Sequence, residues 1–574
     1  MNKAIPGIIP ADDGMKKEEY DFAYSNAIRD LGYEKVLNHF GSIDHVIDHY
    51  EELLANNMPR SSAFFISTVI KKLVLGHPHD VLMNVFSANL SLQIEHDIDI
   101  LEKLILKTKK PSKRTRIMFC SGHWLTGGME RVLSLLFDQL KDDYDIFLLT
   151  PYTDTQSRIT VPDYVTSIRI SSEMFVKHFD SLILAYALLL DINVVIGFMN
   201  MFAKQLNFYN ISVGTDIKTV ASNHEYYFYP YKSAGHYEVV KKRLEAFSNC
   251  TAIVWPLNFN AALCGLYVKN NYVIGNPNNP HFIQDGLKTP KDEIVLCVGR
   301  FDDYVKRIDR ILECFALVIK KVPSAKLVIV GKYNRTAAIS PHSPDTINDL
   351  IINLAIPEES IKFVGEVNNV DEYYSRAKVL LLTSNSEGFG MVVNEAAQFG
   401  VPTVCNYIPG IEDLVVNGTN GYVVEQGDME TMSEKVCDLL KNEKLRAKLG
   451  RGATKLVHTY EPSIIGDKWR FLIDSITKTG DVSSLGKRLN SRLGYKVSDQ
   501  QLFMKILSTE LNEIFYMATQ NAYQRNHGYT HTLLLKIKRL PRRLSENIKF
   551  EGIIRTCIKI VSRSYKIVRK KVTK

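Results

Sequence analysis

Residues 380–404 read LLLTSNSEGFGMVVNEAAQFGVPTV and carry the clearest fold signal in the chain. An apolar run that ends at Thr383 has the composition of a strand buried on both faces. Gly388 and Gly390 then precede a helical pattern, and a new apolar run begins after Pro402. A strand, a glycine-rich turn, a helix and a second strand in this order predict one unit of a parallel-sheet α/β fold.

The same alternation begins at Arg116 and runs through most of the remaining chain. The apolar runs are RIMFC (116–120), DIFLLT (145–150), NVVIGFM (193–199), KTVAS (218–222), AIVW (252–255), EIVLCVG (293–299), AKLVIVG (325–331), IKFVG (361–365), KVLLLTS (378–384) and PTVCN (402–406). Because this is about twice the length of one doubly wound domain, we predict an α/β fold of two doubly wound, parallel-sheet, Rossmann-like domains. The Pro- and Asn-rich loop VIGNPNNPHF at 273–282 marks the divide.

The predicted organisation has four parts. Residues 1–112 form a helical extension, because apolar residues recur there at helical spacing. Residues 113–273 form the first Rossmann-like domain, and residues 274–478 form the second. Residues 479–574 form a basic, helical tail.

Composition indicates the class of protein. The chain has 574 residues, of which 45% are hydrophobic and 23% are charged, as in ordinary soluble proteins. Its eight cysteines are scattered without a CxxC pair, which favours a cytoplasmic location and predicts no metal site. Asp97-Ile98-Asp99 resembles a metal-binding DxD, but it lies in the predicted helical extension, where an exposed helix face explains it better. Residues 1–14 lack the charged-then-apolar run of a secretory signal, so none is expected there, and the longest apolar stretch, Leu182 to Leu190, is too short to span a bilayer.

Positive charge gathers at the end of the chain. Residues 531–574 hold fourteen Lys and Arg and two Glu, a net charge of +12 in a chain of +8, so residues 1–530 carry −4. Basic and aliphatic residues interleave there at near-helical spacing, which predicts peripheral association with the anionic inner face of the cell membrane. A solvated basic tail is the alternative; nucleic acid is not an expected partner, because no recognition motif accompanies the charge.

Candidate site residues follow the predicted strands, where parallel-sheet domains bind ligands. Gly127 and Gly128 follow the first strand and open a helix, so their backbone can approach a phosphate or an acceptor. Arg300 and Lys306 follow the strand at 293–299, and two cations there can neutralise a leaving diphosphate without a metal. The alternative for this pair is two solvated surface charges.

The stretch at 380–404 supplies most of the predicted donor site. The backbone amides of Gly388, Phe389, Gly390 and Met391 would meet a diphosphate at the start of the helix. Glu395 lies further along this helix, where a carboxylate suits the hydroxyls of a ribose. Glu387 would then face the hydroxyls of the sugar.

His224 follows the strand KTVAS in the sequence SNHE and would face the cleft opposite Glu387. A core or surface histidine is the alternative, and the polar neighbours of His224 favour the site.

Together these residues resemble glycosyltransferase family 4, the retaining, metal-independent group 1 glycosyl transferases of the GT-B fold, over about residues 114–475. The resemblance rests on GGMER, on SNH, on Arg300 and Lys306 as GR-x5-K, and on Glu387 and Glu395 as E-x7-E. It implies that Arg300 and Lys306 bind the diphosphate and that Glu395 binds the ribose. It also implies that Glu387 and His224 contact the transferred sugar and that residues 461–476 form a final helix that returns to the first domain.

Two departures from the family pattern stand out. Gly331 is followed by Lys332 and Tyr333 where the family often has GxG, which leaves the base and sugar preference open. Residues 334–351 are longer and more polar than expected and are interpreted as an acceptor-side loop.

The resulting hypothesis is a retaining, metal-independent glycosyltransferase of bacterial cell-envelope or capsule polysaccharide synthesis. It moves a hexose or N-acetylhexosamine from a nucleotide-diphosphate sugar, with UDP as the expected nucleotide, to a lipid-linked or polymeric saccharide. No cofactor is expected. The alternatives are a catalytically degenerate scaffold of the same fold and a nucleotide-sugar 2-epimerase, which would consume sugar nucleotide without an acceptor.

Overall fold

The computed structural model of the chain describes residues 113–479, with gaps chiefly at 152–158, 171–182, 199–215, 225–246 and 280–290, together with Leu489. The predicted helical extension and nearly all of the predicted basic tail lie outside the described residues. The described residues belong mainly to the two predicted α/β domains.

The first domain is built on a parallel sheet with strand order β3-β2-β1-β4-β5-β6-β7. Its elements are β1 (Thr115–Cys120), α7 (Gly128–Leu140), β2 (Tyr144–Pro151), β3 (Thr166–Ile170), β4 (Val194–Phe198), β5 (Lys218–Ser222), β6 (Ala252–Trp255), α11 (Asn258–Gly265) and β7 (Asn271–Val273). The central strands β4 and β6 are buried along their whole length, as a sheet covered on both faces requires.

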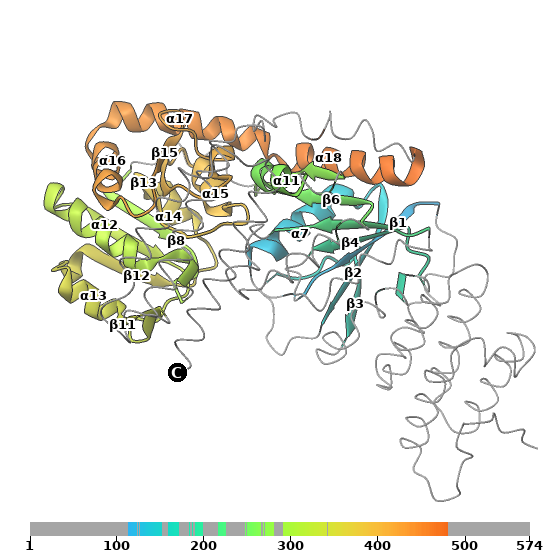
Figure 1. Cartoon of the computed structure of the whole chain (residues 1–574), viewed down its shortest axis with the longest axis horizontal. Coiled ribbons are helices and arrows are strands. Elements are labelled where there is room, and N and C mark those ends of the chain that lie inside the picture. Colours follow the sequence, from blue (N-terminus) through green and yellow to red (C-terminus); the bar gives the residue numbers. More distant parts are fainter. Residues whose placement is uncertain are drawn as a thin grey trace, which may run out of the picture.

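The second domain has a parallel sheet with strand order β12-β9-β8-β13-β14-β15. Its strands are β8 (Ile294–Val298), β9 (Lys326–Val330), β12 (Ile361–Gly365), β13 (Val379–Leu382), β14 (Thr403–Asn406) and β15 (Gly421–Val424), with a hairpin of β10 (Ala338–Ser340) and β11 (Ser343–Thr346). Its helices are α12 (Ile308–Lys321), α13 (Ile347–Asn353), α14 (Asp371–Arg376), α15 (Met391–Gln398), α16 (Met429–Lys441) and α17 (Glu443–Thr459). The two sheets lie side by side in Figure 1.

The predicted fold class is therefore confirmed for the described residues, and each of the ten predicted apolar runs contains a strand. The strands β3, β7 and β15 were not predicted, and all three lie at an edge of a sheet. Edge strands are covered less completely than central ones, so their sequences carry a weaker apolar signal. The expected loop at 334–351 was wrong: it contains the β10–β11 hairpin and the start of α13, where Thr346 and Asp349 form a capping box.

Two glycines allow neighbouring turns of the second sheet to touch. Gly331, directly after β9, has a φ of +124°, and a Cβ built on it would lie 1.9 Å from the carbonyl oxygen of Gly299. No side chain fits in that space, so this position requires glycine. Lys332 and Tyr333, which replace the expected second glycine, have contacts of their own: Lys332 pairs with Asp302, and the Tyr333 ring lies 4.9 Å from that of Phe363.

The last described helix, α18 (Pro462–Asp474), returns from the second domain to pack on α7 of the first. Figure 1 shows α17 and α18 passing along the same side of the molecule, over the second and first sheets respectively. A Cβ on Gly466 would lie 2.7 Å from the Cβ of Gln139, so glycine permits this close approach. The Tyr144 hydroxyl donates a hydrogen bond of 2.9 Å to Asp474. Contacts between elements more than 300 residues apart thus hold the first domain to the end of the second.

The loop at 273–282 is the predicted divide, and its residues 274–278 are buried. The Asn278 side chain donates to the carbonyl oxygen of Val457, and its backbone N–H donates to that of Tyr460. One cluster of buried apolar side chains continues from Leu136 of the first domain, with Trp469 of α18, to Leu296 and Phe389 of the second. The two domains therefore share packed apolar surface, which fixes how the carboxyl edges of their sheets meet.

Candidate active site

The carboxyl edge of the second sheet brings two of the predicted donor-site residues into direct contact. Because β8 and β13 are neighbours in the sheet, the loops that follow them lie together. The Lys306 ammonium lies 2.6 Å from the Glu387 carboxylate, and their side chains are 20% and 12% exposed. This ion pair is half-buried, so each group keeps access to a ligand at the edge of the sheet.

A polar network fixes the backbone around Lys306. Lys306 ends a short 3-10 helix, Tyr304–Lys306, and Arg307 follows in the left-handed region with a φ of 51°. The Thr383 hydroxyl is 3.1 Å from the carbonyl oxygens of Lys306 and of Arg307. The Asn385 backbone N–H donates to Val305. The loop after β13 therefore holds the loop after β8 from both sides.

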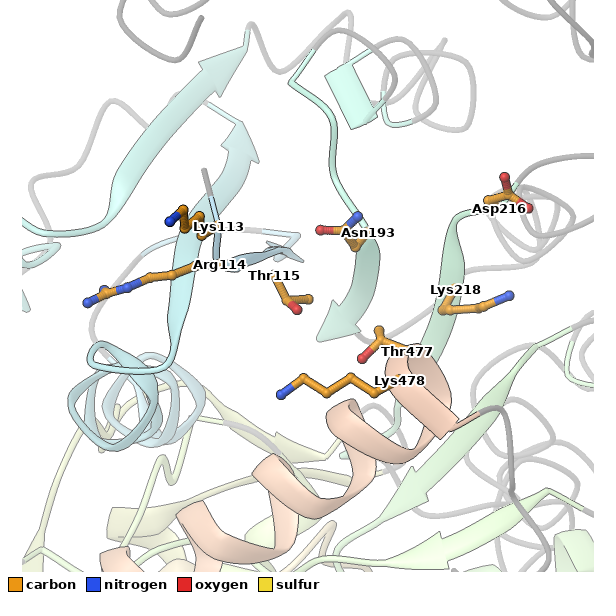
Figure 2. Close-up of a pocket in the computed structure, with 8 residues that line it drawn as sticks. All are labelled: Lys113, Arg114, Thr115, Asn193, Asp216, Lys218, Thr477 and Lys478. Carbon is orange, nitrogen blue, oxygen red and sulfur yellow. The ribbon is translucent and has the colours of Figure 1, made fainter. Parts of the chain in front are cut away.

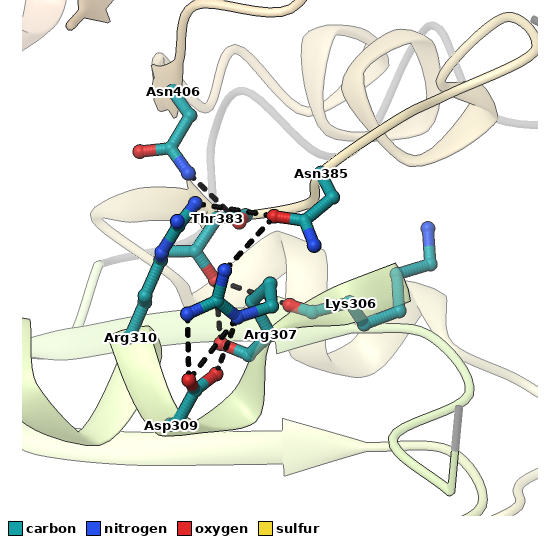
Figure 3. Close-up of polar contacts among 7 residues, drawn as sticks. All are labelled: Lys306, Arg307, Asp309, Arg310, Thr383, Asn385 and Asn406. Carbon is teal, nitrogen blue, oxygen red and sulfur yellow. Dashed lines mark hydrogen bonds and ion pairs between the residues drawn. The ribbon is translucent and has the colours of Figure 1, made fainter. Parts of the chain in front are cut away.

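Arg307 and Arg310 strengthen this link. The buried Arg307 guanidinium binds the Asp309 carboxylate and also donates to the Asn385 side-chain oxygen at 3.1 Å. Arg310 donates to the same oxygen at 3.2 Å. Figure 3 shows these side chains converging on Asn385 while the Lys306 ammonium points away from them. The network positions Lys306 without using its charge.

Two glycines, Gly299 and Gly390, leave space for the Lys306 side chain and allow the turn before α15. A Cβ on Gly299 would lie 3.1 Å from Cε of Lys306, so a side chain there would press on the lysine. Gly390 caps α15 with a φ of +91°, which glycine adopts without strain. Phe389 is buried with its ring 5.1 Å from that of Tyr460, and it anchors the turn. The backbone amides at 388–391 are thus held at the amino terminus of a helix, where anions are favoured.

Glu395 contacts the first domain. Its Oε1 is 3.1 Å from Nη1 of Arg131, on α7, and its Oε2 accepts a 2.8 Å hydrogen bond from the Tyr374 hydroxyl. Burial, and then the Glu395 carboxylate, raise the pKa of Tyr374 well above its usual range. Burial, and then Glu395, also raise the pKa of Asp371, while Arg131 opposes this shift.

Gly127 and Gly128 lie at the amino terminus of α7, directly opposite that of α15. A Cβ on Gly128 would lie 3.9 Å from Cγ of Met391, and a Cβ on Gly127 would lie 2.8 Å from Oε2 of Glu130. The structure thus brings the predicted glycine loop of the first domain to the predicted amide cluster of the second.

His224 lies two residues beyond β5, at the carboxyl edge of the first sheet. Its Nε2 is 3.0 Å from the Ser222 hydroxyl, and its ring lies 4.1 Å from that of Phe198. Burial lowers the pKa of His224 to about 3, so the ring is neutral at physiological pH. Its Nδ1 is buried and has no hydrogen-bond partner among the described residues. Among the described residues, no hydrogen bond or ion pair joins His224 to Glu387, so their predicted opposition stays a prediction.

Arg300 does not join the Lys306–Glu387 pair. It is exposed and forms no hydrogen bond or ion pair with a residue that the structure describes. Sequence reasoning missed Arg131, Tyr374, Arg307 and Asn385. Of these four residues, only Arg131 could have been identified from the sequence, because it ends the GGMER motif.

A cavity of about 510 Å³ lies elsewhere, at the amino-terminal ends of β1, β4 and β5. Figure 2 shows its lining residues, which are Lys113, Arg114, Thr115, Asn193, Asp216, Lys218, Thr477 and Lys478. This is the edge of the sheet opposite the predicted site. Arg114 donates to the carbonyl oxygen of Lys141 just past the end of α7, and Lys478 pairs with Asp474. Arg114 therefore interacts with the carboxyl end of α7, and Lys478 with a neighbouring carboxylate.

Among the described residues, no three His, Cys, Asp or Glu side chains gather closely enough to hold a metal ion. No helix in this part of the chain is both long and apolar enough to cross a bilayer.

Comparison with known proteins gives consistent matches. Residues 278–456 match the family model described as "Glycosyl transferases group 1". The chain is 32% identical over 169 residues to N-acetyl-alpha-D-glucosaminyl L-malate synthase of Bacillus anthracis, covering 29% of this chain and 41% of that protein. It is 25% identical over 177 residues to the capsular polysaccharide biosynthesis glycosyltransferase CapM of Staphylococcus aureus, covering 31% and 44%. The aligned part is thus less than half the length of either relative.

The fold also matches a solved structure. A TarM variant of Staphylococcus aureus, in complex with fondaparinux, alpha-GlcNAc-glycerol and UDP, aligns with a TM-score of 0.52 and 15% identity over 63% of this chain and all of that one. This likeness shows the GT-B fold. With the family match, it confirms the resemblance inferred from the motifs.

Proposed function

We propose, from the match of residues 278–456 to the group 1 glycosyl transferases, that this chain transfers a hexose or N-acetylhexosamine from a nucleotide-diphosphate sugar to a saccharide acceptor. The observation that carries the proposal is the Lys306–Glu387 pair beside the amino terminus of α15. Within one edge of one sheet, the chain places a cation, a helix amino terminus and a carboxylate. These suit a diphosphate and the hydroxyls of the sugar attached to it.

The proposed chemistry uses these groups in sequence. On donor binding, the Lys306 ammonium turns to the diphosphate, with Arg300 as the second cation. This frees Glu387 to accept hydrogen bonds from the sugar hydroxyls. The acceptor hydroxyl attacks the anomeric carbon on the face from which the diphosphate departs, so the configuration is retained. The bond from the anomeric carbon to the phosphate oxygen breaks, and the hydroxyl proton passes to that oxygen. Lys306 and the amides of residues 388–391 stabilise the charge that develops on the leaving group.

His224 supports this scheme as a neutral group. Because its pKa is about 3, it offers hydrogen bonds and not a positive charge at neutral pH. We assign it to the sugar or the reacting centre on the first-domain side.

The donor and acceptor are proposed more broadly. UDP is the proposed nucleotide, supported by the UDP in the TarM complex. A lipid-linked saccharide or surface polysaccharide is the proposed acceptor, supported by the name of the CapM relative. We also propose that the basic segment 531–574 holds the enzyme at an anionic membrane surface.

The test is a donor screen of the full-length protein with EDTA present, which follows nucleoside diphosphate release with and without a membrane extract as acceptor source. Release that needs the extract and fails in Glu387→Ala and Lys306→Ala would support a metal-independent transferase. Release without acceptor, together with a changed nucleotide sugar, would identify the epimerase. A wild-type protein that neither releases nor binds any nucleotide would overturn the proposal and favour the scaffold.

A further inference from the structure

The Glu395 carboxylate is already occupied in this structure. Its Oε1 is engaged by Arg131 from the other domain, and its Oε2 is engaged by the buried Tyr374 hydroxyl. Under the proposed function, the same carboxylate would accept hydrogen bonds from the two hydroxyls of a ribose. Two partners therefore compete for one side of Glu395: the guanidinium of the first domain and the diol of the nucleotide.

We propose that Arg131 is a positioning residue that latches the two domains through Glu395 and must release this carboxylate before the nucleotide ribose binds. The inference rests on the proposed function, because Glu395 is a ribose ligand only if the site takes a nucleotide. It adds a residue of the first domain to the control of donor binding in the second.

The packing of the two helices supports a latch. Arg131 lies one turn beyond Gly128 on α7, and Glu395 lies one turn beyond Met391 on α15. Residues three or four apart share one face of a helix, so α7 and α15 meet at two successive levels: Gly128 with Met391, and Arg131 with Glu395. At the first level, Met391 lies beside a glycine that has no side chain to contact it, and only the second level is ionic. A shift of one domain against the other would change both levels together.

Charge and exposure indicate that this contact can open. The Arg131 side chain is 41% exposed, whereas that of Glu395 is 15% exposed. The arginine can therefore withdraw into solvent, while Tyr374 keeps the carboxylate in place. Asp371 also feels the charge of Arg131, so a released guanidinium has a second carboxylate nearby. Partly exposed ion pairs contribute little, and a bound nucleotide can displace one.

The latch predicts that removal of Arg131 raises UDP affinity, whereas removal of an arginine that binds the ligand would lower it. Removing Arg131 abolishes the competition, so Arg131→Gln should bind UDP about three- to fivefold more tightly than wild type. Arg131→Lys keeps the charge and should stay near wild type. In a Glu395→Gln background, Arg131→Gln should change UDP affinity no further, because the group for which the two partners compete has lost its charge.

The experiment is calorimetry with UDP as the probe, on full-length wild type, Arg131→Gln, Arg131→Lys, Glu395→Gln and the double variant Arg131→Gln/Glu395→Gln. Thermal unfolding without nucleotide, on the same proteins, checks that each is folded and measures the coupling of the pair. Donor KM and kcat add a second readout: the latch predicts a lower KM in Arg131→Gln without a higher kcat.

The outcomes separate the two ideas. If wild type binds no UDP or other nucleoside diphosphate, the proposed function fails, even where unfolding shows that the pair is coupled. If UDP binds wild type but Arg131→Gln leaves the affinity unchanged, the latch alone is overturned. Weaker binding in Arg131→Gln would also overturn it, because Arg131 would then contact the nucleotide directly.

Discussion

Both sheets consist of parallel strands, but the side chains at their carboxyl edges differ in chemistry. At the second sheet, Lys306 and Glu387 form an ion pair that a network around Asn385 and Thr383 holds in place. At the first sheet, His224 is neutral and lies against Phe198 and the Ser222 hydroxyl. The paired charges of Lys306 and Glu387 thus lie at the second edge, whereas the described histidine of the first edge is neutral.

The largest effect should come from Glu387→Gln, which removes one charge of the ionic edge and keeps the shape of the side chain. If this carboxylate orients the sugar, kcat should fall about 10³-fold, since a single well-placed polar group at a reacting centre contributes on this scale. Donor turnover by the purified variant measures it. A variant within threefold of wild type would remove Glu387 from the chemistry and weaken the comparison.

The next largest effect should come from Lys306→Met, which removes the cation from the same edge. We expect kcat/KM for the donor to fall about 10²-fold, because the leaving diphosphate loses a fixed positive charge. Arg300→Met is the matched control, since Arg300 follows the same strand but has no protein partner among the described residues, and about a tenfold loss is expected. Equal losses of kcat/KM in the two variants would show that the pairing of Lys306 with Glu387 adds nothing to catalysis.

Asn385→Ala tests the support of the ionic edge without touching its charges. The Asn385 oxygen accepts from Arg307 and from Arg310, so its loss should destabilise the protein by about 1–2 kcal/mol. Denaturant unfolding measures this, with Asn353→Ala as a matched control, since Asn353 is exposed at the end of α13 in the same domain and its side chain forms no hydrogen bond with a described residue. Equal destabilisation in the two variants would contradict a supporting role for Asn385.

The last effect concerns His224 and depends on pH. The folded pKa of His224 is about 3 and its ordinary value is 6.5, so between these values the unfolded chain binds the proton and the folded one does not. Stability should therefore fall as pH drops from 6.5, with this residue contributing at most about 1.4 kcal/mol per pH unit. His224→Gln should lose that part of the acid sensitivity. Unfolding at pH 7.5 and pH 5 compares the two proteins, and identical acid sensitivity would show that His224 is not the buried neutral group described.

Much of the fold could be predicted because central parallel strands are continuous apolar runs in the sequence. Runs such as VVIGF and VLLL are apolar along their whole length, and each became a central strand. The edge strands β3 and β7 mix polar and apolar residues, β15 is a four-residue strand that begins with glycine, and none of the three was found. The site was predicted to the extent that its residues stand beside strand ends or glycines, as Lys306, Glu387 and Gly390 do. Arg307 and Asn385 act through long-range contacts that no local sequence pattern indicates.

The sequence by itself determined the alternation of strands and helices, the two-domain α/β class and the residues at the strand ends, because periodicity and glycine placement act locally along the chain. Only the tertiary structure decided which of those residues meet. Lys306 and Glu387 are 81 positions apart and touch because β8 and β13 are neighbours in the sheet. Arg131 and Glu395 are 264 positions apart and touch because two helices from different domains begin face to face. Such pairings depend on the order of strands and on the docking of domains, which the global packing of the chain selects.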